Sequence, residues 1–122
     1  MGQTAVSGAQ QTRIAVLADD LIWASRLRAA VERAGAVVVS AKDAATFDAP
    51  FAVIDLGGRA YDGIEAVRAA ASAGAAVLAV AQHEDVDLRK AALAAGAKRV
   101  LSYNKMFSHG PAVITRLIEG TL

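Results

Sequence analysis

The sequence predicts one α/β domain built on a single parallel β-sheet with helices on both faces. Three observations predict it. Short runs of Val, Ile and Leu alternate with longer segments of helical periodicity, and three helix–strand junctions repeat an Ala-Gly-Ala triplet. The length of 122 residues suffices for one domain and not for two. Because apolar residues make up 55% of the chain, a sizeable core is expected and general disorder is excluded.

Five short apolar runs have the composition of strands that are buried on both faces. They cover residues 14–17, 37–39, 51–54, 77–80 and 100–101. The small, polar residues 1–12 are expected to form a flexible tail, so the domain is expected to span residues 13–120.

Four segments have the spacing of amphipathic helices. They cover about residues 21–34, 63–73, 86–95 and 111–119. The first places Trp23, Leu27 and Val31 on one inward face, and the last places Val113 and Leu117 there. Only residues 41–50 separate the second strand from the third, so a shortened second helix is expected around residues 43–47.

Glycine follows three of these helices, at Gly35, Gly74 and Gly96. A glycine just past a helix can adopt the left-handed conformation without a Cβ penalty. Helix, glycine cap and strand therefore form a repeated unit, which implies right-handed crossovers in a parallel sheet. Five strands in a chain of this size fit a flavodoxin-like (βα)₅ fold, a doubly wound sheet with strand order 2-1-3-4-5.

Composition excludes several classes of protein. The chain has no cysteine, which excludes a disulfide scaffold and thiol catalysis. Its 13 basic and 12 acidic residues give a net charge of +1, so no general attraction to nucleic acid or to a membrane is expected. No apolar run approaches the roughly 20 residues of a membrane span, and the start lacks the pattern of a secretory signal. A cytoplasmic protein is expected.

Acidic residues follow the two strands that flank the expected switch point of the sheet. Asp19 and Asp20 follow the first strand, and Asp55 follows the third. Ligands of such sheets bind beyond the carboxyl ends of the strands at that point. Three converging carboxylates would repel one another, so Mg²⁺ is the expected partner. The alternative is that Asp19 and Asp20 cap the first helix and Asp55 ends its strand in solvent. The turn after the first strand, at residues 18–21, has no glycine-rich phosphate loop, which argues against a dinucleotide-binding site.

Three stretches resemble the receiver domain of bacterial two-component response regulators. They are RIAVLADDLIWASRL at residues 13–27, FAVIDLGGRAYDG at 51–63 and DLRKAALAAGAKRVL at 87–101. The resemblance covers about residues 13–120. It implies a phosphorelay protein that accepts a phosphoryl group from a histidine kinase and signals through protein contacts, rather than an enzyme.

The resemblance also implies roles for single residues. Asp55 stands at the phosphoacceptor position, where its carboxylate would attack the phosphohistidine. Mg²⁺ would be held by Asp19, Asp20, Asp55 and the backbone carbonyl of Gly57. The partner would be a histidine kinase or a downstream effector.

The sequence departs from the family pattern at three positions. Ala18 replaces the first acid, Ala81 replaces the hydroxyl residue after the fourth strand, and Tyr103 replaces the lysine after the fifth. Losing the lysine and the hydroxyl removes roughly 3–6 kcal/mol of phosphoryl recognition if the two contacts add. Lys105 and Arg59 are the candidate substitute cations.

These departures favour a degenerate receiver, a pseudo-receiver that acts by protein–protein interaction with impaired phosphorylation. One alternative is a functional phosphoacceptor that uses Asp55 with Mg²⁺. Another is a flavodoxin-like protein that binds a small ligand.

The resemblance also implies an interaction face formed by the fourth helix, the fifth strand and the fifth helix, and its simplest partner is a second copy of the chain. Met106 and Phe107 are expected in a loop there, either exposed or folded back over the end of the sheet. The residues expected on this face are Leu88, Arg89, Leu93, Arg99, Leu101, Tyr103, Met106, Phe107 and Arg116.

Overall fold

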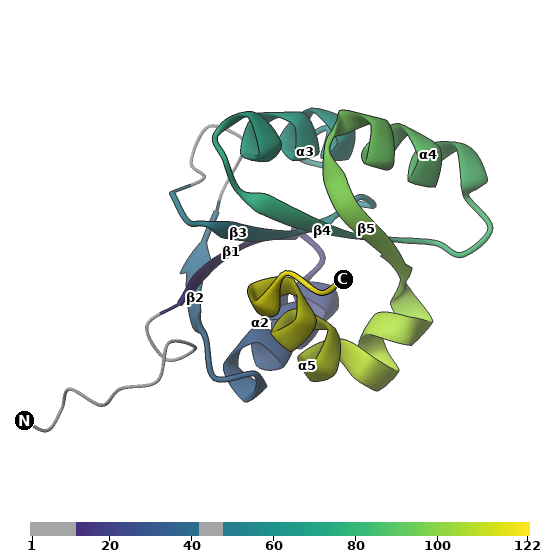
Figure 1. Ribbon diagram of the computed structural model, residues 1–122. Coiled ribbons are helices and arrows are strands. Elements are labelled where there is room, and N and C mark those ends of the chain that lie inside the picture. The colour runs from purple at the N-terminus through teal and green to yellow at the C-terminus, as the bar shows by residue number, and fades with distance from the viewer. Residues whose placement is uncertain (1–11, 42–47) are drawn as a thin grey trace, which may run out of the picture.

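The computed structural model describes residues 12–41 and 48–122, and these residues form one parallel five-stranded sheet (Figure 1). The strand order is β2-β1-β3-β4-β5, which confirms the predicted order. The strands are β1 (Arg13–Leu17), β2 (Val37–Ser40), β3 (Phe51–Asp55), β4 (Ala76–Ala81) and β5 (Ala97–Ser102). Most of the expected tail and the shortened helix expected around residues 43–47 lie outside the described residues.

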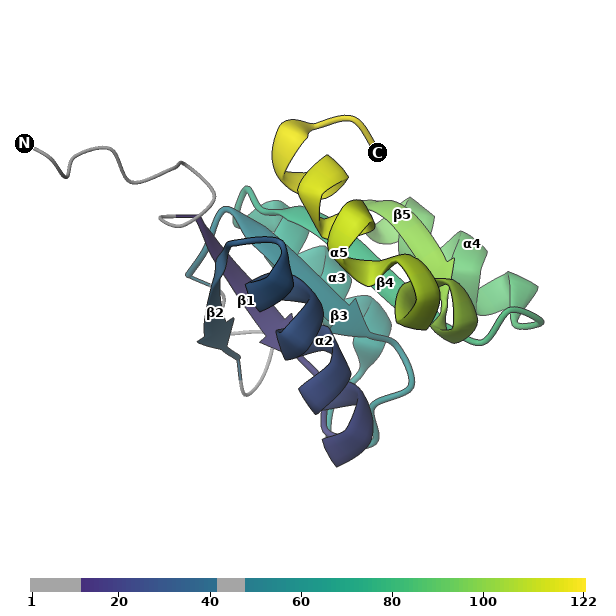
Figure 2. The same cartoon turned by 90° about the horizontal axis from the view of Figure 1, so that it is seen from below.

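Two helices cover each face of the sheet. In Figure 1, α3 (Gly63–Ser72) and α4 (Val86–Ala95) lie above it, and α2 (Leu21–Arg33) and α5 (Tyr103–Glu119) lie below. Figure 2 shows α2 and α5 side by side on their shared face, where they pack against each other. Among the described residues, none of the helices is both long and apolar enough to cross a membrane.

The sheet separates two apolar cores, because successive strand residues point to opposite faces. Ala15 and Leu17 of β1 belong to the core between the sheet and helices α3 and α4. Ile14 and Val16 belong to the core between the sheet and helices α2 and α5. β1, β3 and β4 are buried on both sides, as their continuous apolar runs predict, whereas β5 exposes Lys98 and Arg99.

The three predicted glycine caps are confirmed. The φ angles are +87° at Gly35, +95° at Gly74 and +120° at Gly96, all in the region that favours glycine. At Gly96 close packing adds to this preference, because a Cβ atom there would lie only 2.6 Å from the Cβ of Ala71 in α3. The junction after α4 therefore requires glycine for two physical reasons.

The last helix begins at Tyr103, eight residues before the predicted start at Pro111. The prediction of a loop around Met106 and Phe107 is therefore wrong. The Ser102 hydroxyl caps α5 by accepting from the Lys105 amide at 3.1 Å. The helix is kinked at His109, whose φ of −130° is not helical. The sequence signal at Pro111 therefore marks only the second half of α5.

Candidate functional site

The site lies where β1 and β3 end side by side, with Leu17 of β1 opposite Ile54 of β3. Asp55 ends β3 and is 2% exposed, which makes it the only buried charged residue in the described part of the chain. Its Oδ1 atom accepts a hydrogen bond from the Gly57 amide at 2.9 Å and another from the Tyr103 hydroxyl. The sequence predicted Asp55 either in an acidic cluster or at a strand end in solvent. Neither expectation included its side-chain partner, the phenol of Tyr103.

Tyr103 reaches Asp55 because β5 ends and α5 begins directly beside the end of β3. Its half-buried ring also packs on Trp23 of α2, with the ring centroids 4.7 Å apart. Burial, followed by the hydrogen bond to Asp55, raises the pKa of Tyr103 above its ordinary value. The phenol therefore stays protonated and remains a donor to the carboxylate.

Gly57 leaves the space that this contact needs. A Cβ atom at residue 57 would lie 2.6 Å from the Tyr103 hydroxyl oxygen and 3.3 Å from Oδ1 of Asp55. A side chain there would push the phenol away from the carboxylate. Gly57 thus acts through its missing side chain as well as through its amide.

Tyr61 is a second site tyrosine, and the sequence analysis did not single it out. Its hydroxyl lies 2.6 Å from the backbone oxygen of Asp55 and 3.2 Å from that of Leu17, so it joins the ends of β3 and β1. The ring fills the space over Gly58, where a Cβ atom would lie 2.1 Å from it. Burial, with the nearby charge of Asp55, raises its pKa. The Gly57-Gly58 pair is the sequence feature that could have indicated large side chains packed against this loop.

Asp19 and Asp20 have separate local roles. Asp20 caps α2 by accepting from the Trp23 amide at 2.9 Å, as the helix-capping alternative predicts. Oδ2 of Asp19 accepts from the amides of Arg59 and Ala60, at 2.8 and 2.6 Å. These hydrogen bonds, the Ala60 amide first, lower the pKa of Asp19. Asp19 thus ties the loop after β3 to the end of β1.

The expected convergence of three carboxylates on a cation is not seen in residues 12–41 and 48–122. No three acidic, histidine or cysteine side chains there are grouped so as to hold a metal ion. Asp19 and Asp20 do line one open crevice with Gly57 and Arg59. In the described residues one oxygen of each of these carboxylates accepts from backbone amides or from a phenol instead. The described residues therefore form no ready-made group of three carboxylates for Mg²⁺.

Comparisons with solved structures return receiver domains of response regulators. The receiver domain of the TMAO respiratory system response regulator TorR matches with a TM-score of 0.77 and 15% identity, over 92% of this chain and all of that one. A beryllofluoride-activated NtrC4 receiver domain dimer matches with a TM-score of 0.73 and 21% identity, over 92% of this chain and all of that one. A Burkholderia pseudomallei response regulator with a phosphorylated aspartic acid, calcium ion and citrate matches with a TM-score of 0.69 and 19% identity. The match covers 90% of this chain and 71% of that one.

The chain has the receiver fold. This conclusion rests on structure, since no family sequence model and no curated protein sequence matches the chain. The fold that the resemblance implied is therefore confirmed.

Two of the altered positions carry no polar side chain at this end of the receiver fold. Ala81 is the last residue of β4 and is buried, so it offers only a methyl group where a hydroxyl is expected. Ala18 follows β1 and is half-buried against the core below the sheet. Neither residue can bind a phosphoryl oxygen through its side chain.

The two candidate substitute cations do not reach Asp55 in the described structure. Lys105 lies exposed in the first turn of α5, and its amide is held by the helix cap. Arg59 is exposed and contacts Asp19 through its backbone amide. The phenol of Tyr103, and neither of these cations, is the side chain that contacts the Asp55 carboxylate.

The expected interaction face is only partly exposed. Leu93 on α4 is half exposed. Leu101 is buried, so placing it on this face was wrong, and Met106 is buried as its folded-back alternative predicts; both belong to the core shared by α2 and α5. Phe107 is 63% exposed, but its ring contacts Arg26 of α2, which places it beside α2 and not beside α4.

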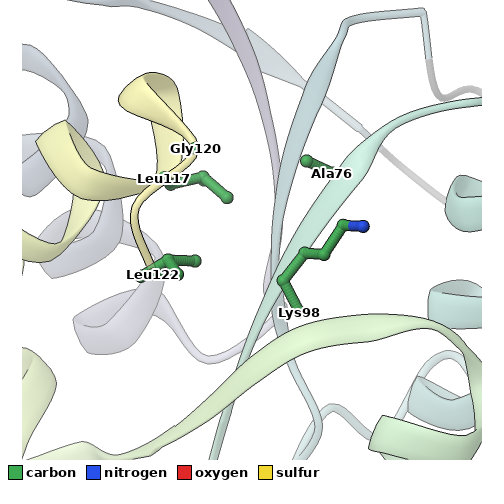
Figure 3. A pocket seen from close by; sticks show the side chains of 5 residues that line it. All are labelled: Ala76, Lys98, Leu117, Gly120 and Leu122. Carbon is green, nitrogen blue, oxygen red and sulfur yellow. The ribbon is translucent and has the colours of Figure 1, made fainter.

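A separate hollow lies away from this site, at the opposite end of β4 and β5. Figure 3 shows it between Ala76, Lys98 and the C-terminal residues Leu117, Gly120 and Leu122. Its volume is about 250 Å³ and its walls carry one charged side chain. None of the residues predicted for the site lines it.

Both tyrosines of the chain are expected to resist ionisation while it is folded. Tyr61 and Tyr103 are its only two tyrosines, and both have raised pKa values. Unfolded phenols lose their proton near pH 10. Because the folded state then holds more protons than the unfolded state, its stability is intact below about pH 10 and falls as the pH rises further.

A spectrophotometric titration at the phenolate band checks this expectation. Phenolate absorbance should appear together with unfolding, which far-UV circular dichroism follows. In urea the same tyrosines should titrate normally. Phenolate that forms with an ordinary midpoint in a chain with native dichroism would contradict the burial and bonding of these hydroxyls.

Proposed function

We propose that the chain is a receiver-like signalling module that acts by protein–protein contact and has an impaired phosphoacceptor. The observation that carries the proposal is the hydrogen bond from the Tyr103 hydroxyl to Oδ1 of Asp55. In this proposal the chain is a binding protein and not an enzyme, with a kinase or effector of a cytoplasmic phosphorelay as its partner.

The chemistry of phosphoryl transfer supports the proposal. An acceptor carboxylate must present an oxygen to the incoming phosphorus, and the charge on the transferred group must be neutralised. Here one oxygen of Asp55 holds two donors, and the side chain is almost fully buried. A phenol supplies no positive charge, and Ala81 supplies no hydrogen-bond donor.

Incubation of the chain with acetyl phosphate and Mg²⁺ is expected to give little aspartyl phosphate. The double variant Ala81→Thr/Tyr103→Lys should give more, because it restores a hydroxyl and an ammonium group to the phosphoryl oxygens. Intact mass spectrometry measures the adduct, and Asp55→Asn in each background shows which part depends on Asp55. Robust phosphorylation of the unaltered chain that disappears in Asp55→Asn would reject the impaired acceptor.

A functional phosphoacceptor is the second candidate. It is favoured by the place of Asp55 at the end of β3, and by the similar Burkholderia pseudomallei response regulator that carries a phosphorylated aspartic acid and a calcium ion. For this candidate the oxygens of Asp19, Asp20 and Asp55 and the Gly57 carbonyl would have to be redirected toward Mg²⁺, which would supply charge neutralisation. The acetyl phosphate assay separates the two candidates.

A further inference from the structure

We propose that the groove between α2 and α5 binds an acidic, apolar-anchored segment of a protein partner. The proposal deepens the proposed function, on which it rests, by assigning a contact face and a class of partner. This face lies on the side of the sheet seen in Figure 2, opposite α3 and α4.

An arginine held by two aromatic rings forms the centre of the groove. Cζ of Arg26 lies 5.0 Å from the ring centroid of Trp23 and 4.5 Å from that of Phe107. Both distances are within the range of cation–π contacts. The rings restrict the arginine side chain before any partner arrives, which lowers the entropy cost of using it in binding.

The guanidinium edge of Arg26 remains available. Among the described residues the ion pairs are Arg13–Asp48 and Arg68–Glu65, and no hydrogen bond is formed by the side chain of Arg26 or Arg33. Stacking contacts the guanidinium through its face and leaves the N–H groups at its edge for a bidentate carboxylate.

The charge of the groove selects an acidic partner. Arg26 and Arg33 both line it, and none of the described residues lining it is acidic. Glu32 of the same helix lines a separate hollow with Arg28. The sign of the charge is therefore local, in a chain whose net charge is only +1.

The size and apolar surroundings of the groove favour a protein segment. Its volume is about 220 Å³, which is below the range typical of cofactor and drug-sized sites and suits single anchoring side chains. Phe107, which lines the groove, is 63% exposed, and Ile22, one turn before Arg26 on α2, is exposed as well. Apolar contacts beside a cation fit an amphipathic helix with carboxylates next to its apolar face.

The test uses a fluorescein-labelled amphipathic peptide of Glu and Leu at helical spacing, and a matched peptide with Gln in place of Glu. Fluorescence anisotropy with the full chain measures binding. We expect the Glu peptide to bind at least about tenfold more tightly than the Gln peptide, and salt to weaken it. Arg26→Gln and Arg26→Lys should each weaken binding of the Glu peptide about tenfold or more, because lysine keeps the charge and lacks the fork. Lys90→Gln, on α4, should leave it unchanged.

Several outcomes would overturn the groove as the site. They are no binding of the Glu peptide, equal binding of both peptides, or equal losses in Arg26→Gln and Lys90→Gln. Arg26-dependent binding of a labelled oligothymidylate without peptide binding would assign the groove to nucleic acid instead. None of these results changes the reactivity of Asp55 toward acetyl phosphate, so failure of the groove is distinguishable from failure of the impaired acceptor.

Discussion

Tyr103→Phe is expected to destabilise the chain and, at the same time, to make Asp55 more reactive. The variant removes the phenolic donor and keeps the ring against Trp23. A hydrogen bond to a charged group contributes about 1.5–3 kcal/mol, and its loss leaves a buried carboxylate with one donor, the Gly57 amide. The free energy of unfolding should fall by about that amount, and the aspartyl phosphate yield from acetyl phosphate should rise.

Urea unfolding followed by Trp23 fluorescence measures the first effect, and intact mass measures the second. Tyr61→Phe is the matched control, since it removes the other tyrosine hydroxyl, whose partners are backbone carbonyls rather than the Asp55 carboxylate. It should cost about 0.5–1.5 kcal/mol and leave the phosphate yield unchanged. In an Asp55→Asn background Tyr103→Phe should cost less, because a bond to a neutral amide is weaker. A variant as stable and as unreactive as the parent would show that the phenol does not restrain Asp55.

Leu27→Ala is expected to cause a large loss of stability through the core alone. Leu27 is fully buried between α2 and the sheet, in the core shared with α5. Removing a buried leucine side chain costs about 2–5 kcal/mol, because transfer energy is lost and a cavity is left. Against a total stability of about 5–15 kcal/mol for a typical domain, this change alone could bring the chain close to unfolding.

Leu21→Ala is the matched control for Leu27→Ala. Leu21 opens the same helix and is 86% exposed, so its replacement should change stability by no more than about 0.5 kcal/mol. Urea midpoints compared at equal slope measure both variants. Similar losses in the two variants would contradict the assigned orientation of α2.

Local patterns determined the fold of this chain. Apolar runs of strand length, helical periodicity between them and glycine at the three junctions depend on neighbouring residues, so they are readable from the sequence alone. They predicted the strand order, the caps at Gly35, Gly74 and Gly96, and the place of Asp55 at the end of β3. They misjudged α5 because Pro111 resembles the first turn of a helix, whereas the helix tolerates a kink at His109.

Tertiary structure decided the site, because its contacts join residues that are far apart in the sequence. Tyr103 and Asp55 are 48 positions apart, and Asp19 and the Ala60 amide are 41 apart. The sequence predicted that Tyr103 would stand where a lysine is expected. Whether its hydroxyl reaches the carboxylate depends on how β5 and α5 pack beside β3, on the space left by Gly57 and on the ring of Trp23. Hydrogen bonds and close contacts are matters of tenths of an ångström, and no periodicity in the sequence encodes them.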